Sequence, residues 1–113
     1  MAVINVYEQY FACEAEFNGR KRNGVNAMLI SDSEAGMITY TAALSFFPHD
    51  DEEDFAISYD AYFETVLYQG KGRRSKKKEA AFLENIRETF DAMAKEHDAV
   101  IDWDSPLIEA RRG

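Results

Sequence analysis

Hydrophobic and polar residues alternate along much of the first half of the chain, which is the pattern of strands with one buried face. The clearest example is a predicted hairpin of residues 25–31 and 37–47, joined across Ser31–Gly36. Its second strand opens with the β-rich run Met37–Thr41 and should end at Pro48, which cannot donate to a strand ladder. This hairpin is the strongest local prediction.

Residues 3–17 fit two interpretations. As a helix, six residues share one apolar sector, namely Val3, Val6, Tyr7, Tyr10, Cys13 and Phe17. As a strand, every second residue from Phe11 to Phe17 faces one side. The pair Asn18-Gly19 follows at once and suits a turn, so a strand over residues 8–17 is preferred, with the helix as the alternative.

Later segments complete the predicted sheet and add a helix. Residues 55–59 and 62–68 alternate as strands. Ser75 can cap a helix that runs to about Glu96, because apolar residues recur along one helical face, namely Phe82, Leu83, Ile86, Phe90, Met93 and Ala94. Ala99–Ile101 could form a last short strand.

These elements predict an α+β fold in which an antiparallel sheet of four to five strands is packed by one long C-terminal helix. A length of 113 residues suits one domain, placed at residues 1–104, with 105–113 as a C-terminal tail. A single cysteine fits a reducing compartment, and no segment is apolar enough to cross a bilayer. A cytoplasmic location without membrane contact is expected.

Charge is unevenly distributed along the chain. The formal net charge is −8, yet six of the 13 basic residues lie between positions 71 and 78. Arg20–Arg22 form a second basic group in a predicted protruding loop, residues 18–24, bounded by two Asn-Gly pairs. Acids concentrate instead in Asp50–Asp54, beside His49.

The main basic cluster coincides with the start of the predicted helix. Cations are unfavourable at the positive end of a helix dipole, whereas free backbone N–H groups and basic side chains there suit a phosphate group. The cluster therefore predicts contacts to phosphate or nucleic acid, made by Lys71, Arg73, Arg74, Lys76, Lys77 and Lys78. Arg20–Arg22 could supply a second contact.

The segment Tyr68–Ala80 locally resembles the loop and last helix of double-stranded-RNA-binding domains. Gly70 and Gly72 match the glycines of that loop, Ser75 the small polar position, and Lys76-Lys77 the lysine pair. In that family the lysines contact phosphates across a groove of A-form RNA. The resemblance implies that this loop binds a nucleic-acid backbone.

Two other interpretations of the charges stay open. The basic cluster could be a solvated loop, or it could pair with Asp50–Asp54. The remaining acidity could instead make the chain a protein–protein interaction module, a nucleic-acid mimic or a homo-oligomer.

Enzymatic chemistry is the least favoured class, and no cofactor is predicted. The chain has no nucleotide-binding glycine loop and no Cys/His metal set. His49 lies in an acidic loop, His97 is expected to cap the end of the helix, and Cys13 fits a core position. Asp102 and Asp104 lack a partner for acid–base catalysis.

Overall fold

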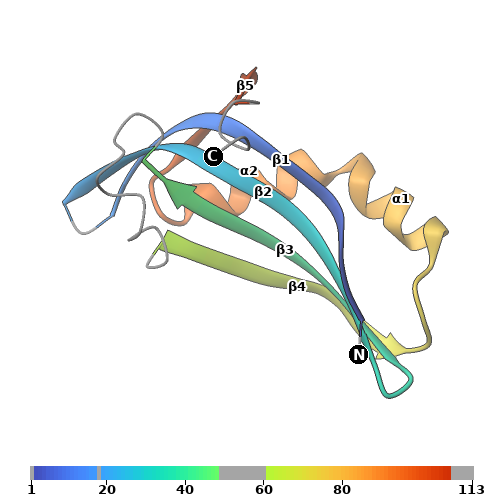
Figure 1. The fold of residues 1–113 in the computed structure, drawn as a ribbon. Coiled ribbons are helices and arrows are strands. Elements are labelled where there is room, and N and C mark those ends of the chain that lie inside the picture. The colour runs from blue at the N-terminus through green and yellow to red at the C-terminus, as the bar shows by residue number, and fades with distance from the viewer. Residues whose placement is uncertain (1, 18, 49–60, 108–113) are drawn as a thin grey trace.

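The computed structural model describes residues 2–17, 19–48 and 61–107. Five strands form one antiparallel sheet in the order β4-β3-β2-β1-β5, and two helices lie between β4 and β5 in the chain (Figure 1). The elements are β1 (Ala2–Phe17), β2 (Arg20–Glu34), β3 (Met37–Phe47), β4 (Tyr62–Lys71), α1 (Lys76–Glu84), α2 (Ile86–Lys95) and β5 (Val100–Pro106). The prediction of an α+β fold with an antiparallel sheet is confirmed.

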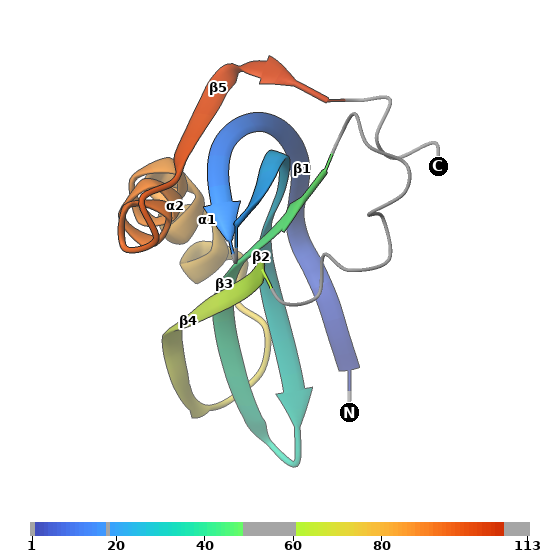
Figure 2. The ribbon, with the colours of Figure 1, turned by 90° about the vertical axis from the view of Figure 1, so that its left-hand side faces the viewer.

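Both helices lie on the same face of the sheet (Figure 2). The residues of β2 and β3 that face them are apolar and opposite one another, so Leu29 pairs with Ala42 and Val25 with Phe46. Phe90 of α2 is fully buried against this layer. Alternation along β2 and β3 therefore determines which face of the central sheet carries the core.

The predicted hairpin is confirmed, with Ala35 and Gly36 at its tip in positive-φ conformations. The helical alternative for residues 3–17 is wrong, because β1 pairs with β2 from Ala2 to Phe17. Strand pairing is a long-range interaction, and it outweighs the apolar sector that a helix would have formed.

The protruding loop predicted at residues 18–24 is wrong for most of its length, since β2 begins at Arg20. Gly19, with φ of 78°, provides the turn. Gly24 instead pairs within the sheet, and its lack of a side chain lets the Phe47 ring lie across it. A Cβ atom at Gly24 would meet that ring at 2.6 Å.

The single long helix predicted from Ser75 to Glu96 is also wrong. Asn85 has non-helical backbone angles, φ −117° and ψ 18°, and separates α1 from α2. Its N–H donates to the carbonyl of Phe82 at 3.2 Å, a tight turn that ends the first helix. The break lets α1 pack Phe82 on Tyr40 while α2 buries Ile86, Phe90, Met93 and Ala94.

The last strand is longer than predicted and lies at the edge of the sheet. β5 continues beyond Ile101 to Pro106 and pairs with β1 at Phe11–Glu14. The predicted strand at 55–59 and the acidic loop Asp50–Asp54 lie outside the described residues. Neither of the two helices is long and apolar enough to cross a membrane.

Candidate functional site

The basic cluster occupies the corner where β4 leads into α1. β4 ends at Lys71 and α1 begins at Lys76, so the intervening residues turn the chain from the sheet onto its helical face (Figure 1). Gly72, with φ of 125°, makes this turn, and its N–H donates to the carbonyl of Gly36 at 2.8 Å. The loop is thereby tied to the tip of the β2–β3 hairpin.

A buried hydrogen-bond network anchors the other side of this loop. The Arg74 guanidinium donates two hydrogen bonds to the Glu79 carboxylate, at 2.9 and 3.0 Å. The Tyr40 hydroxyl donates to the same carboxylate at 2.8 Å and accepts from the backbone N–H of Ser75 at 2.9 Å. The loop, α1 and β3 are therefore joined at one point.

The electrostatics of the network follow from these contacts. The two hydrogen bonds from Arg74 lower the pKa of Glu79, although burial opposes that shift. Burial is the main cause that raises the pKa of Tyr40, so its hydroxyl remains a donor at neutral pH. Glu79 is thus a buried carboxylate that stays ionised because Arg74 faces it.

The structure divides the six predicted contact residues into groups with different surroundings. Arg74 is held by Glu79, and the ammonium of Lys78 lies 5.0 Å from the centre of the Tyr68 ring. The other four side chains are exposed around the corner, namely Lys71, Arg73, Lys76 and Lys77. All six lie between the end of β4 and the first turn of α1.

Local chemistry explains why α1 begins here. The Ser75 hydroxyl accepts a hydrogen bond from the N–H of Lys78 at 3.2 Å, which confirms the predicted cap. Glu79 places an acid in the first turn, where it suits the helix dipole. The exposed lysines have no such stabilising role at this end of the helix.

The second basic group lies far from the first. Figure 1 places the β1–β2 hairpin and the start of α1 at opposite ends of the molecule. Arg20 and Lys21 are exposed, whereas Arg22 is only 1% exposed. The prediction that Arg20–Arg22 form a second phosphate contact is therefore wrong for Arg22, which the fold encloses.

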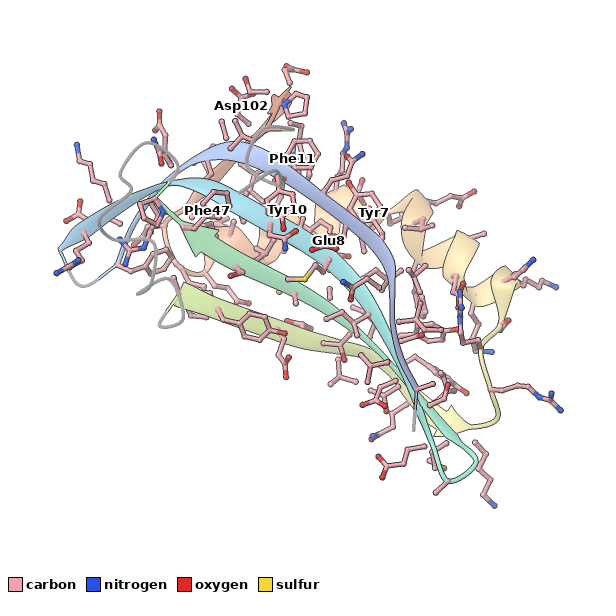
Figure 3. All side chains as sticks on the ribbon, viewed as in Figure 1. Tyr7, Glu8, Tyr10, Phe11, Phe47 and Asp102 are labelled. Atoms are coloured by element: carbon pink, nitrogen blue, oxygen red, sulfur yellow. The ribbon has the colours of Figure 1, made fainter. Side chains whose placement is uncertain are left out.

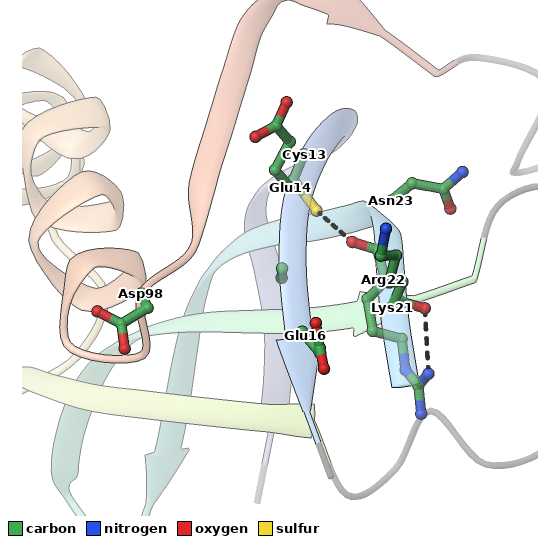
Figure 4. Close-up of a pocket in the computed structure, with 8 residues that line it drawn as sticks. Cys13, Glu14, Glu16, Lys21, Arg22, Asn23 and Asp98 are labelled. Atoms are coloured by element: carbon green, nitrogen blue, oxygen red, sulfur yellow. Dashed lines mark hydrogen bonds between the residues drawn. The ribbon is translucent and has the colours of Figure 1, made fainter. Parts of the chain in front are cut away.

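Arg22 lines a groove of about 510 Å³ together with Cys13, Glu14 and Glu16 (Figure 4). Its guanidinium donates to the carbonyl of Lys21 at 3.3 Å, and the Cys13 thiol contacts the carbonyl of Arg22 at 3.5 Å. Burial, with a smaller contribution from Glu14, raises the pKa of Cys13 to about 12. The thiol is protonated at neutral pH, as expected for a core cysteine rather than a nucleophile.

The remaining candidate residues are engaged in local contacts. His97 follows α2, as predicted, but its ring stacks on Phe63 with centroids 3.7 Å apart. Asp102 accepts hydrogen bonds from the N–H of Asp104 and the hydroxyl of Ser105. Within residues 2–17, 19–48 and 61–107, no three His, Cys, Asp or Glu side chains are grouped to hold a metal ion. His49 lies outside the described residues.

Sequence reasoning missed the contact between Glu79 and Tyr40, which organises the basic corner. One signal was available, because Glu79 is the only acid between Gln69 and Leu83 and directly follows three lysines. The partner on β3 had no comparable signal, since Tyr40 is 39 residues away in sequence and tyrosine is common in strands.

No family model, curated protein or solved structure matches the chain. The resemblance of residues 68–80 to double-stranded-RNA-binding domains therefore stays a prediction, and the site is argued from its own geometry.

Proposed function

We propose that the protein is a non-enzymatic binding module that contacts phosphate groups, with nucleic acid as the leading candidate partner. The contacts are made by Lys71, Arg73, Lys76 and Lys77 at the corner between β4 and α1. The supporting observation is that Arg74, Glu79 and Tyr40 anchor this corner while those four cations remain exposed.

Anchoring favours binding because it reduces the conformational entropy that the loop would lose on contact with a ligand. The Gly72–Gly36 hydrogen bond fixes one side of the loop and the Glu79 network fixes the other. Arg74 is then a positioning residue rather than a phosphate ligand. Its two hydrogen bonds to Glu79 keep the basic corner next to the first turn of α1.

The arrangement of charge supports the same function. Clustered cations at a helix N-terminus repel one another and oppose the dipole, and a bound phosphate relieves both effects. The chain as a whole carries a charge of −8, so non-specific attraction to a polyanion is weak away from this corner. Binding should therefore depend on a few named residues.

The test measures binding of labelled double-stranded RNA, duplex DNA and single-stranded RNA by fluorescence anisotropy across a salt series. The variant combines Arg73→Ala, Lys76→Ala and Lys77→Ala, three exposed residues of the corner. We expect affinity to fall by about tenfold or more, and the slope of log K against log salt to decrease by roughly 0.7 to 0.9 per lost phosphate contact.

The matched control is Arg20→Ala with Lys21→Ala, which removes exposed cations from the opposite end of the molecule. The control should bind as the unmodified chain does. Absence of binding to every nucleic acid at low salt, or equal losses in both variants, would exclude the basic corner as a specific contact. Preference for double-stranded RNA would support the family resemblance of the loop.

A further inference from the structure

Helices α1 and α2 differ in the side chains that they bury. α2 buries four of its ten residues, namely Ile86, Phe90, Met93 and Ala94. Among the nine residues of α1, all of which the structure describes, Glu79 alone is buried, and its side chain is a carboxylate rather than an apolar group. Packing of an apolar face supplies most of the stability of a helix in a protein, so α1 has much less of that support than α2.

The sequence of α1 gives it little stability of its own. A helix of nine residues is shorter than the roughly 12 to 15 residues that make an isolated helix even marginally stable in water. Its first three residues, Lys76–Lys78, place positive charge at the positive end of the helix dipole and so oppose the benefit of the Ser75 cap. In Figure 3, side chains with nitrogen atoms at their tips project outward from the start of α1. The helix therefore depends on its contacts with the sheet.

Those contacts converge on two tyrosines that lie opposite each other on neighbouring strands. Tyr40 of β3 pairs in register with Tyr68 of β4. The Tyr40 hydroxyl donates to Glu79 at 2.8 Å, and the Phe82 ring packs on the Tyr40 ring with centroids 5.2 Å apart. The Lys78 ammonium lies over the Tyr68 ring. The first two turns of α1 thus rest on Tyr40 and Tyr68, which we call the tyrosine pair.

A glycine two residues further along β4 makes room for the second tyrosine. A Cβ atom at Gly70 would lie 2.7 Å from the Tyr68 hydroxyl oxygen and 3.1 Å from the ring carbon that carries it. A side chain at this position would displace the Tyr68 ring from the place where Lys78 contacts it. Gly70 therefore belongs to the support of α1 as well as to β4.

The chain changes direction at both ends of α1. Gly72 has a positive φ of 125° before the helix, and Asn85 has non-helical backbone angles after it. The flanking elements are fixed independently, β4 by its pairing with β3 and α2 by its buried face. The segment between Gly72 and Asn85 can therefore open without breaking the sheet pairing or exposing the buried face of α2.

We propose that α1 is a latch on the phosphate site: it opens as a unit from the tyrosine pair while the sheet and α2 stay folded, and a bound phosphate-bearing ligand holds it closed. Two exposed cations of the basic corner, Lys76 and Lys77, belong to α1, whereas Lys71 and Arg73 belong to β4 and the loop. The closed helix brings the two pairs together, so ligand binding and closure favour each other. Opening is a property of the free chain, and the effect of a ligand on it rests on the proposed function.

Native-state hydrogen exchange followed by NMR tests the latch in the free chain. We expect the backbone amides of residues 80–84 in α1 to have protection factors at least about tenfold lower than those of residues 90–94 in α2, because local opening exposes the former without global unfolding. Equal protection of the two helices would show that α1 unfolds only with the rest of the molecule, and would overturn the proposal.

A matched pair of substitutions distinguishes local opening from global unfolding. Ala81→Gly and Ala92→Gly make the same change at exposed positions of α1 and α2, and each should destabilise its own helix by a factor of about five. Ala92 stays folded when α1 opens, so Ala92→Gly should lower the protection of α2 and change that of α1 less than about twofold. Ala81→Gly weakens a helix that is lost in both events, so it should lower the protection of both. Equal losses in both helices for both variants would overturn the proposal.

A further measurement with ligand tests the coupling to the phosphate site. The probe is the double-stranded RNA of the binding assay, at about 100 times its dissociation constant. Protection of α1 should rise by about 100-fold, the factor expected when only the closed chain binds. Bound RNA that raises the protection of α2 but leaves that of α1 unchanged would overturn the coupling. Absence of RNA binding would overturn the proposed function and the effect of ligand with it, whereas the opening of α1 is decided by the free chain.

Discussion

The two basic segments of this chain, Arg20–Arg22 and residues 71–78, look alike in sequence but differ in which of their charged groups is buried. In the segment Arg20–Arg22, the side chain of the last residue is buried, and Arg22 is only 1% exposed. Around positions 71–78 the arginine that turns inward, Arg74, keeps a 40% exposed side chain and reaches a carboxylate that is itself buried. In the first segment the arginine itself, Arg22, is buried. In the second segment the arginine stays partly exposed and its carboxylate partner, Glu79, is buried.

The difference shows what determines the role of a basic residue. Arg22 lies in β2 and pairs with Ala15 of β1, so sheet pairing sets its position, and its guanidinium donates to the carbonyl of Lys21. Arg74 lies in a loop and depends on Glu79 and Tyr40 for its position. The first segment therefore contributes mainly to folding, and the second can position a surface that binds ligands.

The largest expected effect comes from Arg22. Replacement by Ala removes a long buried side chain and the packing of its methylene groups, and we expect the free energy of unfolding to decrease by about 2 to 3 kcal/mol. Urea denaturation followed by circular dichroism measures this change. Arg20→Ala, at an exposed neighbour in the same hairpin, should cost less than about 0.5 kcal/mol. Equal effects would contradict the assigned difference in burial.

Glu79→Gln disrupts the hydrogen bonds that hold Arg74 in the second basic segment, and we expect it to lower the free energy of unfolding by less than Arg22→Ala does. The substitution keeps the shape of the side chain but loses the charged hydrogen bonds from Arg74, and we expect a decrease of about 1 to 2 kcal/mol at pH 7. This decrease in unfolding free energy is small for the loss of a buried carboxylate, because solvent screens the partly exposed Arg74.

The pH dependence gives this substitution a distinctive signature. The pKa of Glu79 is lower in the folded chain than its ordinary value of 4.5, so its contribution is fully present above that value. The contribution is lost as the pH falls through the lower, folded-state pKa. The difference in unfolding free energy between the original chain and Glu79→Gln should therefore shrink in acid, and a constant difference from pH 7 to pH 3 would contradict the assignment.

Tyr40→Phe removes only the hydroxyl that joins β3 to the loop. Ser75 then loses the acceptor for its N–H and Glu79 loses one donor, for an expected cost of about 1 kcal/mol. Tyr62→Phe is the matched control, since its hydroxyl donates to the exposed Glu64 and should cost less than about 0.5 kcal/mol. Thermal unfolding compares the two, and a larger effect at Tyr62 would refute the anchoring role of Tyr40.

Sequence patterns predicted the elements that depend on nearby residues. Alternation placed the β2–β3 hairpin, and Ser75 was recognised as a cap because its acceptor geometry involves only the next three residues. The same reasoning failed at Asn85, where one residue with modest helix propensity interrupts an otherwise periodic apolar face. It also failed at Gly24, whose role comes from the Phe47 ring on the neighbouring strand.

Periodicity or spacing over a few residues was enough to predict the β2–β3 hairpin, the start of α1 and the concentration of cations beside it. Packing between distant segments decided that Arg22 is enclosed, that Arg74 is held by Glu79, and that β5 pairs with β1 at Phe11–Glu14. Those properties arise when strands and helices distant in sequence pack together, and no local pattern records which partner each side chain will meet.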